Sequence, residues 1–152
     1  MAESFRRAPG VRDHRGAGTH LLVRAGEYVC ALPLGSVRRV VRSLTVHPLP
    51  GAADELQGLA EFGGEPLPVL SLARLVNASP GANPSYPVTV VVWVGAADAR
   101  EMVGLSADAA LEVVELSTAS IVAGDGGLLL GEAPLNGEVV RVLDLESLGR
   151  DH

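Results

Sequence analysis

The stretch GLAEFGGEPLPVLSLARLV, residues 58–76, contains the features that decide the fold. Two apolar runs, 59–62 and 65–70, flank the pair Gly63-Gly64, and the stretch ends in what reads as one helical turn, 71–76. Glycine readily adopts the positive φ angles that a two-residue hairpin turn requires. The stretch therefore predicts a tight β-hairpin followed by a short helix, and none of its residues is an obvious catalytic group.

The rest of the chain continues this pattern of short apolar runs and turns. Asn136-Gly137, between two apolar runs, is the strongest short hairpin signal available. Many short strands at close spacing favour a sandwich or barrels over a parallel α/β sheet. Besides the first hairpin, we expect strands at residues 20–25, 27–32, 37–42, 88–94, 101–106, 111–116, 128–133 and 138–143, with turns at 25–27, 81–87 and 125–127.

The chain also repeats itself. GEPLPVLSLARL (64–75) matches GEVVRVLDLESL (137–148) at six of twelve positions, with an offset of 73 residues. EYVCALPLGSVRRVV (27–41) aligns with EMVGLSADAALEVVE (101–115) at an offset of 74. Two nearly equal offsets predict two copies of one unit of about 65 residues. The alternative is chance, because apolar strand-and-turn patterns look alike.

Each copy would hold five strands and one closing helical turn. Five strands on so short a chain close best as a barrel, because closure removes exposed sheet edges. We therefore predict an all-β protein of two small five-stranded barrels packed together, spanning roughly residues 19–85 and 86–152. The closing turns would be 71–76 and 144–148, and Ser71 and Asp144 are candidate helix caps.

Composition excludes several classes of protein. The net charge of −6 argues against nucleic acid as the main partner. Cys30 is the only cysteine, so an internal disulfide is impossible and a cysteine-based metal site is not expected. No apolar run is long enough to span a membrane, and the first 18 residues look like a disordered tail and not a secretion signal. A reducing cytoplasm fits best.

The residues offer little chemistry. The four histidines lack metal-binding spacing, and no serine has a nucleophile-elbow context. The glycine-rich stretch 124–127 lacks the lysine and helix of a phosphate loop, and a pair such as Asp108 and Asp144 is by default two solvated acids. We therefore predict a protein that is not an enzyme and needs no metal or cofactor. A small β-barrel enzyme or ligand-binding protein remains the alternative from another class.

Charge differs between the two copies. The run 37–42 carries Arg38, Arg39 and Arg42, whereas the equivalent run 111–116 carries Glu112 and Glu115. Matching faces of opposite charge would suit head-to-tail contact between molecules, or two different partners. Ordinary solvated strand faces are the alternative.

Almost all of the ordered chain resembles the CheW-like domain family, the scaffold of bacterial chemotaxis coupling proteins. The resemblance is carried by residues 20–41, by Pro-Leu-Pro-Gly at 48–51, by the hairpin stretch 58–76, and by the second-half runs 88–94, 101–116 and 138–148. It implies two five-stranded SH3-like barrels without catalysis. It further implies a cytoplasmic adaptor that bridges the signalling tip of a methyl-accepting chemoreceptor to the regulatory domain of a histidine kinase, and that joins other CheW-like domains in rings of the receptor array.

Three positions depart from the family pattern. Gly63 stands where the family has an arginine, which removes a five-donor fork, and Ser71 stands where the family has an acid. Arg39 occupies a position that is often acidic in the family. The alternative function is therefore a divergent scaffold that binds only one of the two partners, for example the receptor but not the kinase, in a non-flagellar motility pathway.

The resemblance also implies two binding surfaces. A receptor helix would lie in an apolar groove between the barrels, since helix-in-groove contact is a common recognition mode. Phe62 could instead pack in a barrel core. Candidates for the groove are Val37, Arg39, Gly58, Phe62, Gly63, Val90, Val91 and Val92. Candidates for the kinase or ring contact are Leu49, Pro50 and Leu56 in one loop, with Glu112 and Glu115 on the mirrored strand.

Overall fold

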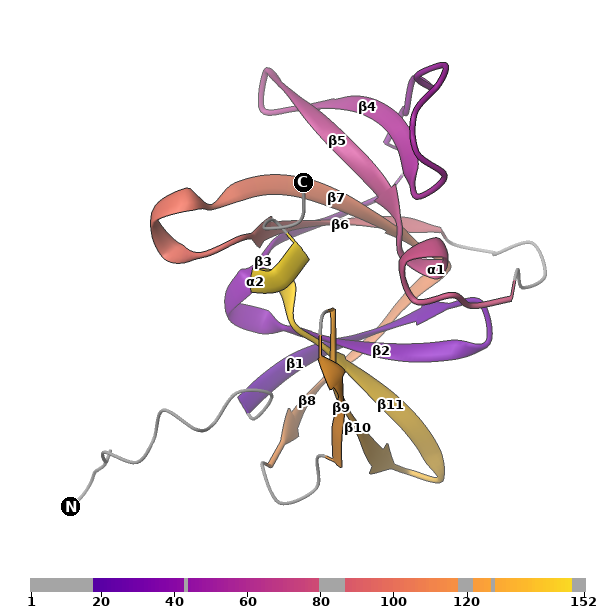
Figure 1. Cartoon of the computed structure of the whole chain (residues 1–152), viewed down its shortest axis with the longest axis vertical. Helices are drawn as coiled ribbons and strands as arrows, with labels where there is room; N and C mark the ends of the chain where they lie inside the picture. The colour runs from indigo at the N-terminus through magenta and orange to yellow at the C-terminus, as the bar shows by residue number, and fades with distance from the viewer. Residues whose placement is uncertain (1–17, 43, 80–86, 118–121, 127, 149–152) are drawn as a thin grey trace.

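The computed structural model describes residues 18–42, 44–79, 87–117, 122–126 and 128–148 (Figure 1). The expected N-terminal tail lies outside the described residues except for Gly18, which begins the first strand. No helix within these ranges is long and apolar enough to cross a membrane.

Short strands dominate the described chain, as predicted. The elements are β1 (Gly18–Ala25), β2 (Tyr28–Pro33), η3 (Leu34–Ser36), β3 (Val37–Arg42), β4 (Leu56–Phe62), β5 (Glu65–Ser71), α1 (Leu72–Leu75), β6 (Val88–Val94), η4 (Ala97–Ala99), β7 (Glu101–Ala107), β8 (Ala109–Leu116), β9 (Val122–Gly126), β10 (Leu129–Leu135), β11 (Glu138–Leu143) and α2 (Leu145–Leu148).

The strands form two sheets that pack on each other. One is six-stranded, with the order β8-β1-β2-β11-β10-β9, and the other is five-stranded, with the order β3-β6-β7-β5-β4. The same arrangement occurs in both sheets: the order β8-β1-β2-β11-β10 in one corresponds to β3-β6-β7-β5-β4 in the other. β9 is an additional strand at one edge of the first sheet. The predicted fold of two packed five-stranded units is confirmed, and β9 is the strand that the sequence analysis missed.

The predicted boundary between the units, near residue 85, needs correction. The hairpin β1–β2 belongs to the sheet that the second half of the chain builds, and β6–β7 belongs to the sheet of the first half. The links that make this exchange are the parallel pairs β2–β11 and β5–β7. A sequence repeat shows that two units exist, but not which hairpin completes which sheet.

The repeat itself is visible in the register of these parallel pairs. Val69 lies opposite Gly104, and Val142 lies opposite Ala31. Val69 and Val142 are 73 residues apart, and so are Ala31 and Gly104. The structural offset is therefore 73 at both places, one less than the sequence alignment gave for the β2 and β7 regions.

The two predicted hairpin turns and the predicted Ser71 cap are confirmed. Gly63 and Gly64 have φ angles of 61° and 82°, and Asn136 and Gly137 have 52° and 83°. These values match a type I′ turn in both hairpins. The Ser71 side chain accepts a hydrogen bond from the Arg74 backbone N–H at 3.2 Å and so caps α1.

Three clusters of buried side chains hold the molecule together. The largest lies between the sheets and draws alternate residues from both exchanged hairpins, including Leu21 and Val23 of β1 and Val90 and Val92 of β6. The intervening residues point the other way, so that Leu22 joins the core of the six-stranded sheet and Val91 that of the five-stranded sheet. Strands β1 and β6 are therefore covered on both faces, which explains their continuous apolar sequences.

Candidate functional site

β3 and β8, each at one edge of its sheet, carry three of the six exposed large apolar side chains among the described residues. Val40 pairs with Val90 across β3–β6, and Val113 pairs with Leu21 across β1–β8. Directly opposed residues of an antiparallel pair point to the same side of the sheet. Because Val90 and Leu21 belong to the central core, Val40 and Val113 continue that core to its margin, where solvent reaches them.

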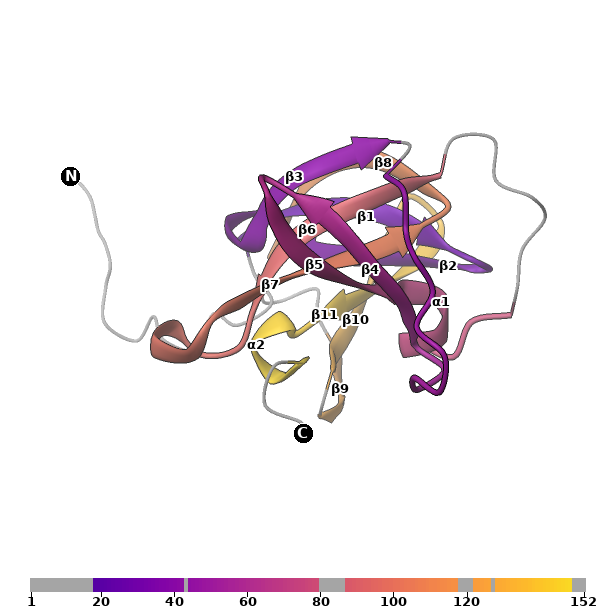
Figure 2. The same cartoon turned by 90° about the horizontal axis from the view of Figure 1, so that it is seen from above.

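The exposure of these side chains is high for apolar residues. Val40 is 41% exposed, Leu111 44% and Val113 54%. Figure 2 shows β3 and β8 along the same side of the molecule, opposite α2. Exposed apolar groups gathered at one place commonly mark an interaction site. We call this surface the β3/β8 face, and it comprises Arg38, Val40, Arg42, Leu111, Val113 and Glu115.

Charge on the face is divided by strand. Arg38 and Arg42 are exposed on β3, whereas Glu112 and Glu115 are exposed on β8. Thr19 Oγ1 donates a hydrogen bond to Glu115 Oε2, which holds that carboxylate beside β1. The two strands occupy equivalent places in their sheets. The opposite charge that the sequence predicted on matching strands is therefore present.

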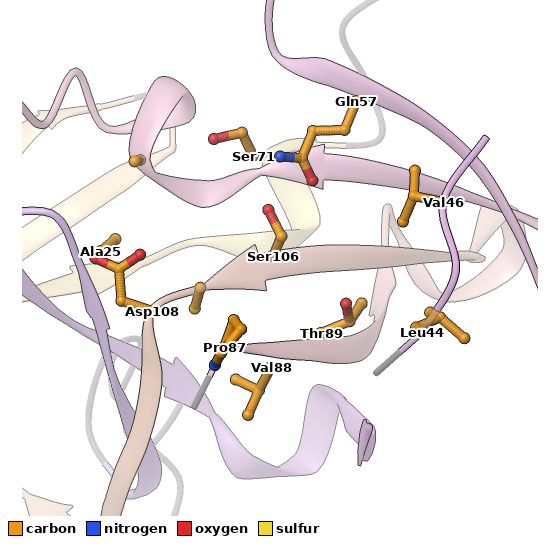
Figure 3. A pocket seen from close by; sticks show the side chains of 12 residues that line it. Ala25, Leu44, Val46, Gln57, Ser71, Pro87, Val88, Thr89, Ser106 and Asp108 are labelled. Atoms are coloured by element: carbon orange, nitrogen blue, oxygen red, sulfur yellow. The ribbon is translucent and has the colours of Figure 1, made fainter. Parts of the chain in front are cut away.

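A hollow of about 340 Å³ adjoins the end of β3 (Figure 3). Val88, which pairs with Arg42, is part of its lining, together with Gln57, Ser71 and Asp108. Two of these polar groups already serve the fold, since Ser71 caps α1 and Asp108 Oδ2 accepts a hydrogen bond from the Gly26 backbone N–H at 2.9 Å. The hollow therefore has a mixed polar and apolar lining and brings no reactive groups together.

The described residues assemble no catalytic or metal centre. No group of three or more potential metal ligands occurs among them. Asp108, between β7 and β8, lines this hollow, whereas Asp144, between β11 and α2, lines a different one, so the possible acid pair does not form one site. Burial raises the pKa of the Cys30 thiol to about 12, which leaves it protonated and unreactive at neutral pH.

Histidine likewise offers no site in the described ranges. The His20 ring is buried, with Nδ1 2.8 Å from the Gly18 carbonyl oxygen and Nε2 without a hydrogen-bond partner. The His47 backbone forms a bridge with Leu59, and neither histidine lines the hollow.

The central strand residues assigned to the receptor groove are corrected by the structure. Val90, Val91 and Val92 are fully buried, because β6 is covered on both faces, and their side chains present no surface to a partner. Val37 is half-buried and packs against the same central core. The exposed neighbours of this core are Val40 on β3 and Val113 on β8.

The other groove candidates lie on or beside β4. Gly58 is buried with φ at +153°, and a Cβ at this position would lie 2.1 Å from the His47 carbonyl oxygen, so its role is structural. Phe62 is half-buried against the core of the five-stranded sheet, with the Arg39 guanidinium carbon 6.0 Å from its ring centre. Gly63 is exposed at the hairpin tip, where an added Cβ meets nothing within 4 Å.

The residues predicted for a kinase or ring contact fall on two separate surfaces. Leu49 and Pro50 are exposed in the loop before β4, and Leu56 is half-buried at the start of that strand. Glu112 and Glu115 lie on β8 in the other sheet. Figure 1 shows the loop and β8 at opposite ends of the view.

Sequence reasoning missed Val40, Leu111 and Val113. In the sequence they look like ordinary core positions of alternating strands, because alternation does not reveal that a strand is outermost in its sheet. The sequence did contain one signal. The runs 37–42 and 111–116 carry more charged residues than the runs 88–94 and 20–25, which form the neighbouring inner strands β6 and β1.

The comparisons with known proteins agree with this architecture. The family model of the CheW-like domain matches residues 19–152. The scaffolding protein TtCheW from Thermoanaerobacter tengcongensis, known from a crystal structure, is similar with a TM-score of 0.76 and 18% sequence identity, over 90% of this chain and 94% of that one. At this identity the likeness supports the fold alone. No curated protein sequence matches the chain significantly.

Proposed function

The chain belongs to the CheW-like domain family, a family of non-catalytic chemotaxis scaffolds, and on that premise we propose that it couples a chemoreceptor signalling tip to a CheA-type histidine kinase. It would do so in the cytoplasm, as part of a receptor array. The absence of a catalytic or metal centre among the described residues accords with a role in binding.

The observation that carries the proposal is the β3/β8 face. Val40, Leu111 and Val113 are exposed apolar side chains on the two strands, and Val40 and Val113 continue the central core into solvent. The tip of a chemoreceptor is helical, and an amphipathic helix binds by laying its apolar stripe on such a surface. We place the receptor helix here, between β3 and β8. Arg39 and Phe62, at the side of β3 that faces β4, lie next to this position but not within it.

The kinase contact is proposed for the exposed loop around Leu49 and Pro50. This loop is tied to the body of the five-stranded sheet, because the Ser71 backbone N–H donates to the Glu55 carbonyl oxygen at 2.7 Å. An anchored loop with exposed apolar and proline residues can present a preformed surface. Its separation from the β3/β8 face would let two partners bind at once.

A second candidate function, binding of only one partner, is favoured by Gly63 and Ser71. Serine and aspartate both cap helices, so Ser71 preserves the start of α1 while removing the charge of the family's acid. Gly63 likewise preserves the hairpin turn while removing the family's arginine. Both changes keep the fold and alter only what the hairpin offers to a partner.

Calorimetric titration tests the proposal. The chain is titrated in parallel with a receptor signalling-tip fragment and with the kinase regulatory domain, using Val113→Asp and, as a matched control, Val139→Asp, whose valine is 57% exposed on β11. Coupling predicts micromolar binding to both partners, with receptor binding weakened at least ~tenfold by Val113→Asp alone. Receptor binding without kinase binding would establish the single-partner scaffold, and no binding to either folded partner would refute both.

A further inference from the structure

We infer that the β3/β8 face selects its partner helix by charge, accepting one whose apolar stripe is flanked by acidic residues on the side next to β3 and by basic residues on the side next to β8. This inference rests on the proposed function, because it names the chemistry of the helix placed on that face. It follows from the side chains of this chain, where β3 is basic and β8 is acidic.

The apolar part of the face is narrow. One valine on β3 and two apolar side chains on β8, Leu111 and Val113, are its exposed apolar members on these strands. Charged residues stand on both sides of this strip, with Arg38 and Arg42 on one strand and Glu115 on the other. A helix laid on the strip therefore brings its two flanks against walls of opposite sign.

The spacing of the charges suits a helix that runs along the strands. Arg38 and Arg42 are four residues apart, about 13 Å at the rise of a β-strand. Two turns of an α-helix rise about 11 Å. Flank residues that recur every two turns on the partner would therefore meet Arg38 and Arg42 in succession.

The walls act mainly by excluding the wrong partner. Exposed ion pairs at the rim of an interface add little affinity, but like charges placed opposite each other are costly. A helix with two basic flanks would meet Arg38 and Arg42, and one with two acidic flanks would meet Glu115. Glu112 pairs with Leu22 and therefore faces the core of the six-stranded sheet, away from the strip. Specificity then comes from repulsion on one side of the helix.

The neighbouring charged residues Arg39 and Arg24 do not face the apolar strip, so β3 remains its basic side and β8 its acidic side. Arg39 lies over the Phe62 ring and pairs with Val91, so it faces the core of the five-stranded sheet and not the strip. Arg24 pairs with Val29 and Ala109, and its guanidinium lies 3.7 Å from the Glu138 carboxylate on the far side of the β1–β2 pair from β8.

The test uses three proteins and three helical peptides with one shared apolar stripe. The peptides carry mixed, all-acidic or all-basic flanks, and the full chain is compared with Arg38→Glu/Arg42→Glu, which makes both walls acidic, and with Glu115→Arg, which makes both basic. We expect the natural chain to prefer the mixed peptide, the first variant the basic peptide and the second the acidic peptide. Each preference should be about tenfold in Kd and should shrink at high salt.

A control variant, Glu61→Arg/Glu65→Arg, changes the same charge on the exposed β4–β5 hairpin and should keep the natural preference. Circular dichroism confirms that each variant is folded. If the peptides bind and Val113→Asp abolishes binding, but flank charge makes no difference, the charge inference is overturned while helix docking stands. If no peptide binds and the receptor fragment also fails to bind, helix docking itself is refuted.

Discussion

Gly58 illustrates how a single residue can be assigned to the wrong role from sequence. It lies in the distinctive hairpin stretch, and the resemblance to the CheW-like family made it a candidate for the binding groove. The structure instead packs it against the backbone at His47, whose N–H and carbonyl both bond to Leu59. A φ of +153° adds a conformational reason for glycine. The position secures the loop to β4.

Replacing this glycine should therefore destabilise the protein. Gly58→Ala would place a methyl group within 2.1 Å of the His47 carbonyl oxygen, and we expect it to lower the free energy of unfolding by at least ~2 kcal/mol. Gly35→Ala is the matched control, because nothing lies within 4 Å of its Cβ position, and it should change stability by less than ~0.5 kcal/mol. Urea denaturation measures both. Equal stability of the two variants would contradict the structural role.

Cys30 allows a prediction on pH. Burial raises the pKa of its thiol to about 12 in the folded chain, whereas an unfolded cysteine titrates near ~8.5. The unfolded state thus releases this proton first, so the stabilisation is complete below ~pH 8.5 and is lost as pH rises toward 12. In urea denaturation from pH 7 to 10, the natural chain should lose stability faster than Cys30→Ala, by up to ~1.4 kcal/mol per pH unit. If the free energy of unfolding fell equally with pH in both proteins, the Cys30 thiol would not be shielded from solvent in the folded chain.

At the scale of elements, local signals predicted best where the backbone itself demands particular residues. The two glycines at 63–64 and Asn136-Gly137 specify type I′ turns through their own conformational preferences, and the structure has both. β9 was missed because its sequence, Val122–Gly126, is glycine-rich and reads as a turn. Burial of Val90 to Val92 was not predicted, because it depends on a hairpin from the other half of the repeat covering β6.

The β4–β5 turn gives a prediction at this scale. Gly63→Asn should keep the free energy of unfolding within ~0.5 kcal/mol, since asparagine tolerates the left-handed conformation and already occupies the equivalent position 136. Gly63→Val should cost ~1–2 kcal/mol, because a β-branched side chain is strained at positive φ. Thermal and urea unfolding distinguish the two. A tolerated valine would mean that the turn is not held in the type I′ geometry.

At the scale of the whole molecule, the exchange of hairpins makes the two halves interdependent. Each sheet requires two strands from the other half of the chain, and the largest core lies between the exchanged hairpins. The sequence repeat predicted two units divided near residue 85, but each sheet contains strands from both sides of that residue. A long-range parallel pairing, such as β5 with β7, leaves no local signal in a single sequence.

Interdependence predicts that neither half folds alone. Fragments 1–85 and 86–152, expressed separately, should lack cooperative thermal unfolding by circular dichroism, because each lacks the hairpin that completes its sheet. Mixed or co-expressed, they should recover a native-like spectrum. Cooperative unfolding of either fragment by itself would argue against the exchanged arrangement.

The central claim is that a partner helix docks on the β3/β8 face, and amide hydrogen exchange of the full chain with and without a receptor signalling-tip fragment tests it most directly. Docking predicts slower exchange in β3 and β8, at residues 37–42 and 109–116, with the loop around Leu49 unchanged until the kinase domain is added. Protection of the β4–β5 hairpin tip with β3 and β8 unaffected would contradict the account and move the receptor to the surface around Phe62 and Gly63.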